Sequence, residues 1–348
     1  MSSFNSKRVR VLGVIVASLA LTLSGTTLAS AAGNTMATCP VTLIPKTTDN
    51  PFFAAIHYGA DQAAKELSGL KVNFTGTAQT DAQGQIQRVQ AATTNKACVI
   101  NIASVDSTAL VPALKAAKKK GIKVVTYDAD VLPSARTLFI SQDSEVALGA
   151  GMFKALAAQM NYKGDYAILS AQSTAQNQNA WLREAAKEAK KAIYKNMKLV
   201  KTVYGDDDDK KSYDQAVALM NAYPNLSGIF TPEPAGLGGA VKAKDDLKYN
   251  PNLVITGLGW PPGQADLLKS GKVKSFILWS PVDLGYLTYF ANNALVTGKI
   301  KGRVGDTFLA GRLGKMTVGA KGVVIMNGMV TYTAANVDSL LAGYKTSD

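Results

Sequence analysis

VTLIPKTTDNPFF, Val41 to Phe53, is the stretch that decides the fold. Its first four residues, Val41 to Ile44, form an apolar run typical of a short buried strand, and the polar turn that follows leads into a helix opening at Pro51. Because open parallel α/β sheets bind ligands at the carboxyl ends of their strands, the stretch predicts one wall of a small-molecule cleft. Four side chains would reach that wall: Lys46, Asn50, Phe52 and Phe53.

Residues 1–31 are predicted to form a secretory signal peptide. Lys7, Arg8 and Arg10 make a basic start, Val11 to Leu23 is apolar, and Ala29-Ser30-Ala31 provides small residues for cleavage. A membrane anchor is the alternative, but the apolar run is short for spanning a bilayer. The sequence therefore predicts export to the periplasm or the cell surface, with cleavage near Ala31.

The basic charge of the chain does not predict a nucleic-acid partner. The net charge is +13, and it falls to +10 when the three basic residues of the predicted signal are removed. The lysines are scattered over predicted helix surfaces and are not interleaved with aromatic residues, as a nucleic-acid groove would require. We interpret the charge as a solvated face; attraction to an anionic envelope surface stays open.

Two cysteines precede comparable apolar runs, Cys39 before Val41 to Ile44 and Cys98 before Val99 to Ile102. If these runs are neighbouring parallel strands, the two thiols lie side by side, and an oxidising compartment favours a disulfide. Two separate buried thiols are the alternative. With His57 as the only histidine, the sequence predicts neither a zinc site nor a cysteine–histidine nucleophile, and no metal or cofactor.

Strand-like and helix-like segments alternate from residue 40 onward, which predicts an α/β fold with two Rossmann-like lobes of five parallel strands each. The first five strand-like segments fall at 41–44, 71–75, 98–103, 122–127 and 137–141. The second set falls at 166–169, 199–204, 228–231, 253–258 and 275–279. We expect an N-terminal lobe over 39–141 plus 281–323, a C-terminal lobe over 142–280 plus 324–348, and a hinge of three short crossings.

Five motifs in fixed order carry a resemblance to a known family. The PK turn with its NPFF helix is followed by four segments: GIKVVTYDAD (121–130), TAQNQNAW (174–181), FTPEPAGLGGA (230–240) and FILWSPVDLG (276–285). The chain resembles the type I periplasmic solute-binding proteins of sugar ABC transporters, nearest the autoinducer-2-binding and rhamnose-binding branch. The resemblance implies two lobes of the periplasmic binding protein type I fold, a ligand between them, and a membrane permease as partner.

The resemblance also implies ligand-binding positions. The family's ligand lysine matches Lys46, its strand-end aspartate matches Asp128, and its Asp-Gln pair matches Asn177 and Gln178. The family's loop proline matches Pro232, and its nearby alanine position holds Pro234. Asn177 and Pro234 depart from the autoinducer-2 pattern, so they leave the ligand identity open while keeping the class.

The chemistry of these residues suits a sugar, deoxysugar or polyol. A carboxylate such as Asp128 or Asp130 accepts hydrogen bonds from two neighbouring hydroxyls, and aromatic rings cover the apolar face of a sugar ring. Four aromatic residues could do so: Phe52, Phe53, Trp260 and Trp279. The alternatives are turn caps for the aspartates, helix-start packing for the phenylalanines and interlobe packing for the tryptophans.

The function predicted from these observations is that of a monomeric, non-enzymatic binding protein that delivers a sugar-like ligand to an ABC importer. An autoinducer-2 receptor and an exported carbohydrate enzyme are the alternatives, although no G-x-S-x-G elbow is present. A repressor with the same core fold is disfavoured by the export signal. The acidic run Asp206 to Asp209 lacks the spacing of a calcium loop and is interpreted as a solvated turn.

Overall fold

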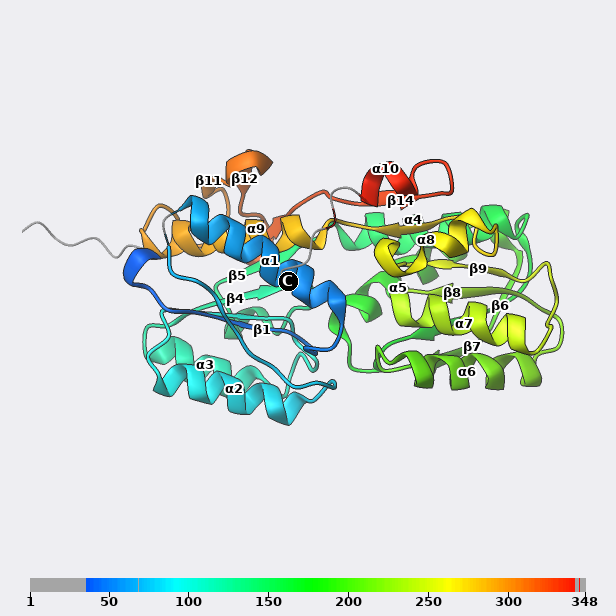
Figure 1. Cartoon of the computed structure of the whole chain (residues 1–348), viewed down its shortest axis with the longest axis horizontal. Helices are drawn as coiled ribbons and strands as arrows, with labels where there is room; N and C mark the ends of the chain where they lie inside the picture. The colour runs from blue at the N-terminus through cyan, green and yellow to red at the C-terminus, as the bar shows by residue number, and fades with distance from the viewer. Residues whose placement is uncertain (1–35, 68, 342–343, 345–348) are drawn as a thin grey trace, which may run out of the picture. The chain divides into compact units, whose positions relative to one another are not determined.

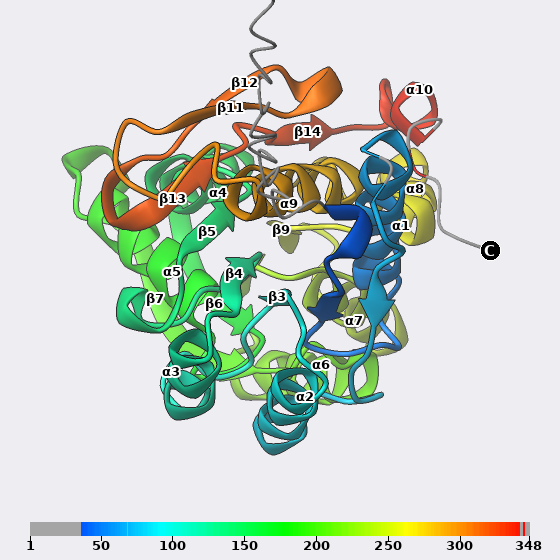
Figure 2. The same ribbon diagram turned by 90° about the vertical axis from the view of Figure 1, so that its left-hand side faces the viewer.

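The computed structural model describes residues 36–67, 69–341 and 344 (Figures 1 and 2), so the predicted signal peptide lies outside the described residues. The described chain contains two parallel sheets with helices on both faces, as the alternating pattern predicted. Within this part of the chain, none of the helices combines the length and the apolar character needed to cross a bilayer.

The first sheet has six parallel strands in the order β13-β5-β4-β3-β1-β2. Helices α2 and α3 cover one face, and α9 packs on the other with α1 against it (Figure 1). The strands are β1 (Val41–Ile44), β2 (Asn73–Phe74), β3 (Val99–Ile102), β4 (Lys123–Tyr127), β5 (Leu138–Ser141) and β13 (Val323–Ile325). The helices are α1 (Pro51–Glu66), α2 (Ala82–Thr94), α3 (Val111–Lys119) and α9 (Pro281–Val296).

The second sheet has four parallel strands in the order β7-β6-β8-β9. Helices α4 and α5 pack together, as do α6 and α7. The strands are β6 (Lys163–Ser170), β7 (Asn196–Tyr204), β8 (Leu226–Thr231) and β9 (Val254–Gly257). The helices are α4 (Glu145–Gln159), α5 (Gln176–Ala189), α6 (Asp209–Ala222), α7 (Pro234–Asp246) and α8 (Pro261–Lys269).

The expectation of five parallel strands in each lobe was wrong in detail. β10 (Phe276–Leu278) touches the second sheet only through an isolated bridge between Leu258 and Ile277. β9 has already ended at Gly257, whose φ of +150° turns the chain, and β10 instead pairs antiparallel with β14 (Val330–Tyr332). The first sheet gains β13 beside β5. The remaining elements are the hairpin of β11 (Thr307–Leu309) and β12 (Lys315–Thr317) and the helix α10 (Val337–Leu341).

Helices α1 and α9 approach so closely that glycine is required where they cross. A Cβ on Gly59 would stand 1.8 Å from the carbonyl oxygen of Val282, and one on Gly285 would stand 1.9 Å from that of Ile56. α9 is buried over most of its length and also contacts β4 and β5. The helix that follows β10 is therefore held in the layer above the first sheet.

The predicted disulfide is confirmed: Cys39 and Cys98 are bonded, with their Cα atoms 5.2 Å apart. The two cysteines stand at the amino ends of β1 and β3, which are adjacent parallel strands in register from Val41 and Val99. The bond closes a sequence separation of 59 residues. In the chain-entropy model such a link stabilises the fold by about 4 kcal/mol.

The chain passes between the two sheet-bearing regions at three places, after β5, between β10 and α9, and between β13 and β14. In each sheet the parallel strands place their carboxyl ends along one edge. Residues directly after β1 and β4 and those after β6, β7 and β8 are consequently the ones that meet between the sheets.

Candidate functional site

Lys46 follows β1 in a turn that is fixed from beneath by the buried amide of Gln85. The Gln85 side chain donates from Nε2 to the carbonyl oxygens of Pro45 (2.8 Å) and Ala103 (2.7 Å), and its Oε1 accepts from Val105 N (3.0 Å). These bonds tie the turns after β1 and β3 together. Lys46 is thereby delivered, 3% exposed, to the carboxyl edge of the first sheet.

Asp128 follows β4 and reaches the same point. Its φ is +58°, a left-handed conformation that aspartate tolerates better than most residues, so the chain turns sharply as the strand ends. Its Oδ2 lies 3.8 Å from Nζ of Lys46, and both side chains are buried. An ammonium and a carboxylate from two strands of one sheet are thus paired out of contact with solvent.

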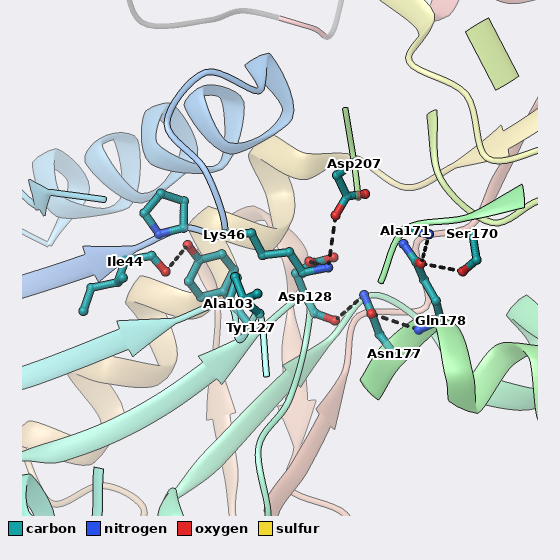
Figure 3. Close-up of polar contacts among 12 residues, drawn as sticks. Ile44, Lys46, Ala103, Tyr127, Asp128, Ser170, Ala171, Asn177, Gln178 and Asp207 are labelled. Carbon is teal, nitrogen blue, oxygen red and sulfur yellow. Dashed lines mark hydrogen bonds and ion pairs between the residues drawn. The ribbon is translucent and has the colours of Figure 1, made fainter. Parts of the chain in front are cut away.

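Asp207 reaches the same ammonium from the second sheet. It lies between β7 and α6, and its Oδ2 is 3.8 Å from Nζ of Lys46, as Figure 3 shows. The ion pair of Lys46 with Asp128 lies within the first sheet, whereas the ion pair with Asp207 joins the two sheets. Nζ of Lys46 therefore lies between two carboxylate oxygens, and both N···O distances are too long for direct hydrogen bonds.

The first turn of α5 supplies two amides. Asn177 donates from Nδ2 to the carbonyl oxygen of Asp128 (3.4 Å), a second contact between the sheets, and its Oδ1 accepts from Gln178 N (Figure 3). Oε1 of Gln178 accepts from the Ser170 hydroxyl and from Ala171 N, each at 2.8 Å. The oxygen end of Gln178 is thus occupied, and its NH2 group is the end available to a ligand.

These side chains enclose a cavity of about 40 Å³. This volume is far below the roughly 300–1,000 Å³ of a typical small-molecule site, so the walls lie close together. Ten of the residues expected from the sequence line it: Lys46, Asn50, Phe52, Phe53, Asp128, Asn177, Gln178, Pro232, Pro234 and Trp279.

Aromatic rings form one side of the cavity. The Phe52 ring stands edge-on to Phe53, at 5.2 Å between centroids, and to Trp279, at 6.0 Å. Trp279 is in turn edge-on to Trp181, at 5.8 Å. Phe52 belongs to α1 and Trp279 follows β10, so the aromatic wall is assembled from segments far apart in the sequence.

Two of the expected residues do not line the cavity. Asp130 is bound by Arg136, whose Nε and Nη2 donate to its two carboxylate oxygens at 2.6 Å each, and it also accepts from Val131 N. This buried pair holds the loop after β4 and leaves Asp130 committed to Arg136. Trp260 lies beside the cavity, with its ring 6.4 Å from that of Phe52.

The sequence reasoning missed several lining residues. Asp207, Glu233, Trp181, Leu258 and Leu278 all line the cavity. Interpreting Asp206 to Asp209 as a solvated turn was wrong for Asp207, whose side chain is only 11% exposed. Asp206 and Asp207 both have left-handed φ values, +59° and +56°, which turn the second carboxylate inward. Glu233 had a signal, since it stands within the FTPEPAG motif between Pro232 and Pro234.

Burial shifts the acidity of two carboxyl groups in the cavity. It raises the pKa of Asp128 to about 6, with the Lys46 ammonium opposing the rise and the Asp207 carboxylate adding to it. Burial also holds the pKa of Glu233 well above its ordinary range. The Asp207 carboxylate raises it further, and backbone N–H groups of Gly236 and Ala235 act in the opposite direction.

Three buried polar atoms of the cavity lining have no hydrogen-bond partner. They are Oδ2 of Asp207, Oε2 of Glu233 and Nε1 of Trp279. A buried polar atom left unpaired costs roughly 1–3 kcal/mol, so such atoms are rarely retained without a partner. Two carboxyl oxygens and one indole N–H of the lining residues are therefore left for a hydroxylated molecule to pair with.

A separate hollow of about 850 Å³ lies at the amino edge of the first sheet and is lined by lysines, glycines, threonines and apolar residues. Among the residues that the structure describes, no three His, Cys, Asp or Glu side chains gather in a group that could hold a metal ion. The candidate site is therefore the closed cavity between the sheets.

Comparison with known proteins agrees with this geometry. A family model described as a periplasmic binding protein domain matches residues 41–300. A solute-binding protein of an ABC transporter from Clostridium phytofermentas with bound L-rhamnose is 28% identical, covers 88% of this chain and 99% of its own, and has a TM-score of 0.84.

Two further relatives extend the comparison. A sugar ABC transporter structure from Actinomyces odontolyticus is 36% identical over 87% of this chain and 98% of its own, with a TM-score of 0.71. The D-allose-binding periplasmic protein of Escherichia coli is 26% identical over 70% of this chain and 80% of its own length.

Proposed function

Because this chain belongs to the periplasmic binding protein domain family, we propose that it captures an uncharged sugar, deoxysugar or polyol between its two sheets and delivers it to an ABC importer. The chain is a solute-binding protein and not an enzyme. The relatives named above bind L-rhamnose and D-allose, which are uncharged sugars.

The observation that carries the proposal is the set of unpaired polar atoms in the cavity. Hydroxyl groups donate and accept, so one sugar can pair with Oδ2 of Asp207, Oε2 of Glu233 and the indole N–H of Trp279. The lysine and carboxylates around them make charge-assisted bonds that are stronger than neutral ones. The aromatic wall supplies an apolar surface for the C–H face of the ring.

Binding requires the cavity to open, since its volume of about 40 Å³ is far below the roughly 300–1,000 Å³ of a typical small-molecule site. We propose lobes over 39–141 plus 281–325 and over 142–280 plus 326–348, which rotate about the three crossings. The last boundary lies two residues beyond the expected 323 because all of β13 pairs with β5 in the first sheet. The contacts that cross between the lobes, Lys46 with Asp207 and Asn177 with Asp128, would break on opening. A bound sugar would replace them as the link between the lobes.

Export, oligomeric state and permease docking complete the proposed function. We propose that the signal peptide is cleaved near Ala31 and that the exported protein is a monomer. It would present both closed lobes to a membrane permease, so that only the liganded form docks productively. N-terminal sequencing of the exported protein tests the cleavage site, and size-exclusion chromatography with light scattering tests the monomeric state.

A thermal-shift screen followed by calorimetry tests the function. The panel contains L-rhamnose, D-allose, D-ribose, several polyols and autoinducer-2, with a sugar acid as a charged comparison. A ligand at 100 times its dissociation constant adds about 2.7 kcal/mol of apparent stability, which the melting curve resolves. Asp128→Asn, which keeps the turn because asparagine also tolerates a left-handed φ, should abolish the shift. No shift with any uncharged sugar would contradict the proposal.

A further inference from the structure

Glu233 is the most deeply buried carboxyl group that lines the cavity. It is 2% exposed, and within the described residues it forms no ion pair. The charged groups that face it are Asp207, from the loop before α6, and across the cavity Lys46 and Asp128. Lys46 is already shared between two carboxylates, so a third negative charge would be uncompensated.

The two oxygens of Glu233 have different surroundings. Oε1 lies 3.4 Å from the Ser212 hydroxyl, and it is 2.6 Å from the position that a Cβ on Gly236 would take, so it faces the start of α7. Oε2 is buried and has no hydrogen-bond partner, and the residue lines the cavity. Oε2 is therefore the oxygen left for a ligand to pair with.

The backbone holds this arrangement in place. Glu233 is the residue before α7, with prolines on both sides. Proline fixes its own φ and restricts the residue before it, so the backbone of the Pro232-Glu233-Pro234 segment has few alternative conformations. The backbone position from which the carboxyl group extends is therefore restricted.

We propose that Glu233 is a ligand-binding residue that stays a neutral carboxylic acid and donates the hydrogen on Oε2 to an acceptor oxygen of the bound sugar. This inference rests on the proposed sugar-binding function and deepens it. Burial and the neighbouring Asp207 carboxylate favour the protonated form and outweigh the donors around Oε1, which favour ionisation, in agreement with the raised pKa of this group. Because those donors occupy Oε1, Oε2 is the oxygen that carries the proton. A carboxylic acid kept neutral by an apolar site is a known way to provide a hydrogen-bond donor.

The inference predicts a ligand class. The partner of Oε2 must be an acceptor, such as a hydroxyl, ring or carbonyl oxygen, and a protonated amine at that position would meet a donor. The cleft should therefore prefer an uncharged sugar to its amino-sugar analogue. Discrimination by one buried unpaired group is on the order of tenfold or more.

Glutamine is the matched replacement, because its amide keeps an acceptor where Oε1 lies and a donor where the Oε2 hydrogen lies. L-Rhamnose is the first probe, and any tighter-binding sugar from the screen replaces it. We expect Glu233→Ala to lose at least tenfold in affinity at neutral pH and Glu233→Gln to restore most of it. Wild-type affinity should fall as the pH rises and Glu233 ionises, and the fall should be absent in Glu233→Gln. Glu145→Gln, at an exposed position, is the control.

A measurement without ligand separates this inference from the proposed function. The infrared difference spectrum between wild type and Glu233→Gln should contain the carbonyl band of a protonated carboxylic acid at a pH well above 6, where Asp128 is ionised. Absence of that band overturns the neutral-acid assignment whatever the sugar does. Presence of the band, together with a Glu233→Gln variant that folds but binds as poorly as Glu233→Ala, overturns the donor role. If the band is present and no sugar binds the wild type, the proposed function fails instead.

Discussion

Nζ of Lys46 and Oδ2 of Asp207 lie 3.8 Å apart across the interior of the protein, and they join a strand end of the first sheet to a loop of the second. The same ammonium lies 3.8 Å from Asp128, so one buried lysine balances two buried carboxylates. Removing one partner of a buried ion pair is costly because the remaining charge keeps its desolvation penalty.

Lys46→Met should therefore destabilise the unliganded protein by roughly 3 kcal/mol at neutral pH. The loss should shrink when Asp207→Asn is added, because the second substitution removes a charge that no longer has a partner. Urea denaturation of the two single variants and the double variant measures this coupling. Lys119→Met, at an exposed lysine near the end of α3, is the control and should change stability little. Additive effects at Lys46 and Asp207 would contradict the pairing.

Asp128 gives a pH dependence with a definite sign. Its pKa is about 6 in the folded protein against an ordinary value of 3.8, so the folded state binds the proton more tightly than the unfolded state. The resulting stabilisation is complete below about pH 4 and is lost as the pH rises through about 6.

Asp128→Asn, which is neutral at every pH, should escape this loss. Between these limits the stability of the wild type relative to the variant should fall by about 3 kcal/mol, at 1.36 kcal/mol per pKa unit. Denaturation curves at several pH values check the difference. Asp49→Asn, at an exposed carboxylate of the turn after β1, is the control and should follow the wild type. Parallel curves for wild type and Asp128→Asn would contradict the burial argument.

Part of the site followed from one rule applied to the sequence. Polar residues directly after buried parallel strands meet at one sheet edge, and Lys46 was predicted on that basis. Asp128 was predicted from the family resemblance, and both residues line the cavity. The strand-end rule does not predict Asn177 and Gln178, because they begin a helix and do not follow a strand. They were predicted only from the family resemblance, which rests on the order of the motifs along the chain.

Asp207 was missed for a physical reason. Its neighbours in the acidic run are partly or largely exposed, and only the paired left-handed φ values at Asp206 and Asp207 turn this one carboxylate inward. All four residues of the run are aspartates, so the residue types do not indicate which of them take left-handed φ values. Helix α4 was missed as well, because it is apolar on several faces and shows no clear helical period.

Loss of the disulfide should lower stability without touching the ligand site. Cys39 and Cys98 stand at the amino edge of the first sheet, opposite the strand ends that line the cavity. The double variant Cys39→Ala/Cys98→Ala should lose about 4 kcal/mol of unfolding free energy by the chain-entropy model. Calorimetric titration of the folded double variant should return the wild-type affinity. A marked loss of affinity would mean that the disulfide sets the position of Lys46 through β1.

The close crossing of α1 and α9 should be intolerant of a single methyl group. A Cβ on Gly59 would stand 1.8 Å from the backbone oxygen of Val282, so Gly59→Ala forces the helices apart and should cost about 1–3 kcal/mol. Gly151→Ala in α4 is the matched control. Its Cβ would meet nothing nearer than 3.6 Å, so it should gain up to about 1 kcal/mol from helix propensity. Equal effects of the two substitutions in thermal unfolding would show that the helices separate freely.

The indole N–H of Trp279 should matter more for ligand binding than for the stability of the unliganded protein. Its ring is 1% exposed and packs edge-on against Phe52 and Trp181, while its Nε1 is buried without a hydrogen-bond acceptor. Trp279→Phe removes that unpaired donor and keeps an aromatic ring in the wall. The unliganded variant should therefore lose less stability than the smaller ring alone implies, because the desolvation penalty of the N–H disappears.

The same substitution should weaken sugar binding about tenfold or more, because the ligand oxygen that accepts from Nε1 is left unpaired in the closed cavity. Urea denaturation without ligand and calorimetry with the best-binding sugar measure the two effects on one preparation. Trp260→Phe, beside the cavity but not lining it, provides the comparison and should leave affinity nearly unchanged. If Trp279→Phe binds as tightly as wild type, the indole N–H does not contact the ligand, and the ring serves only as packing.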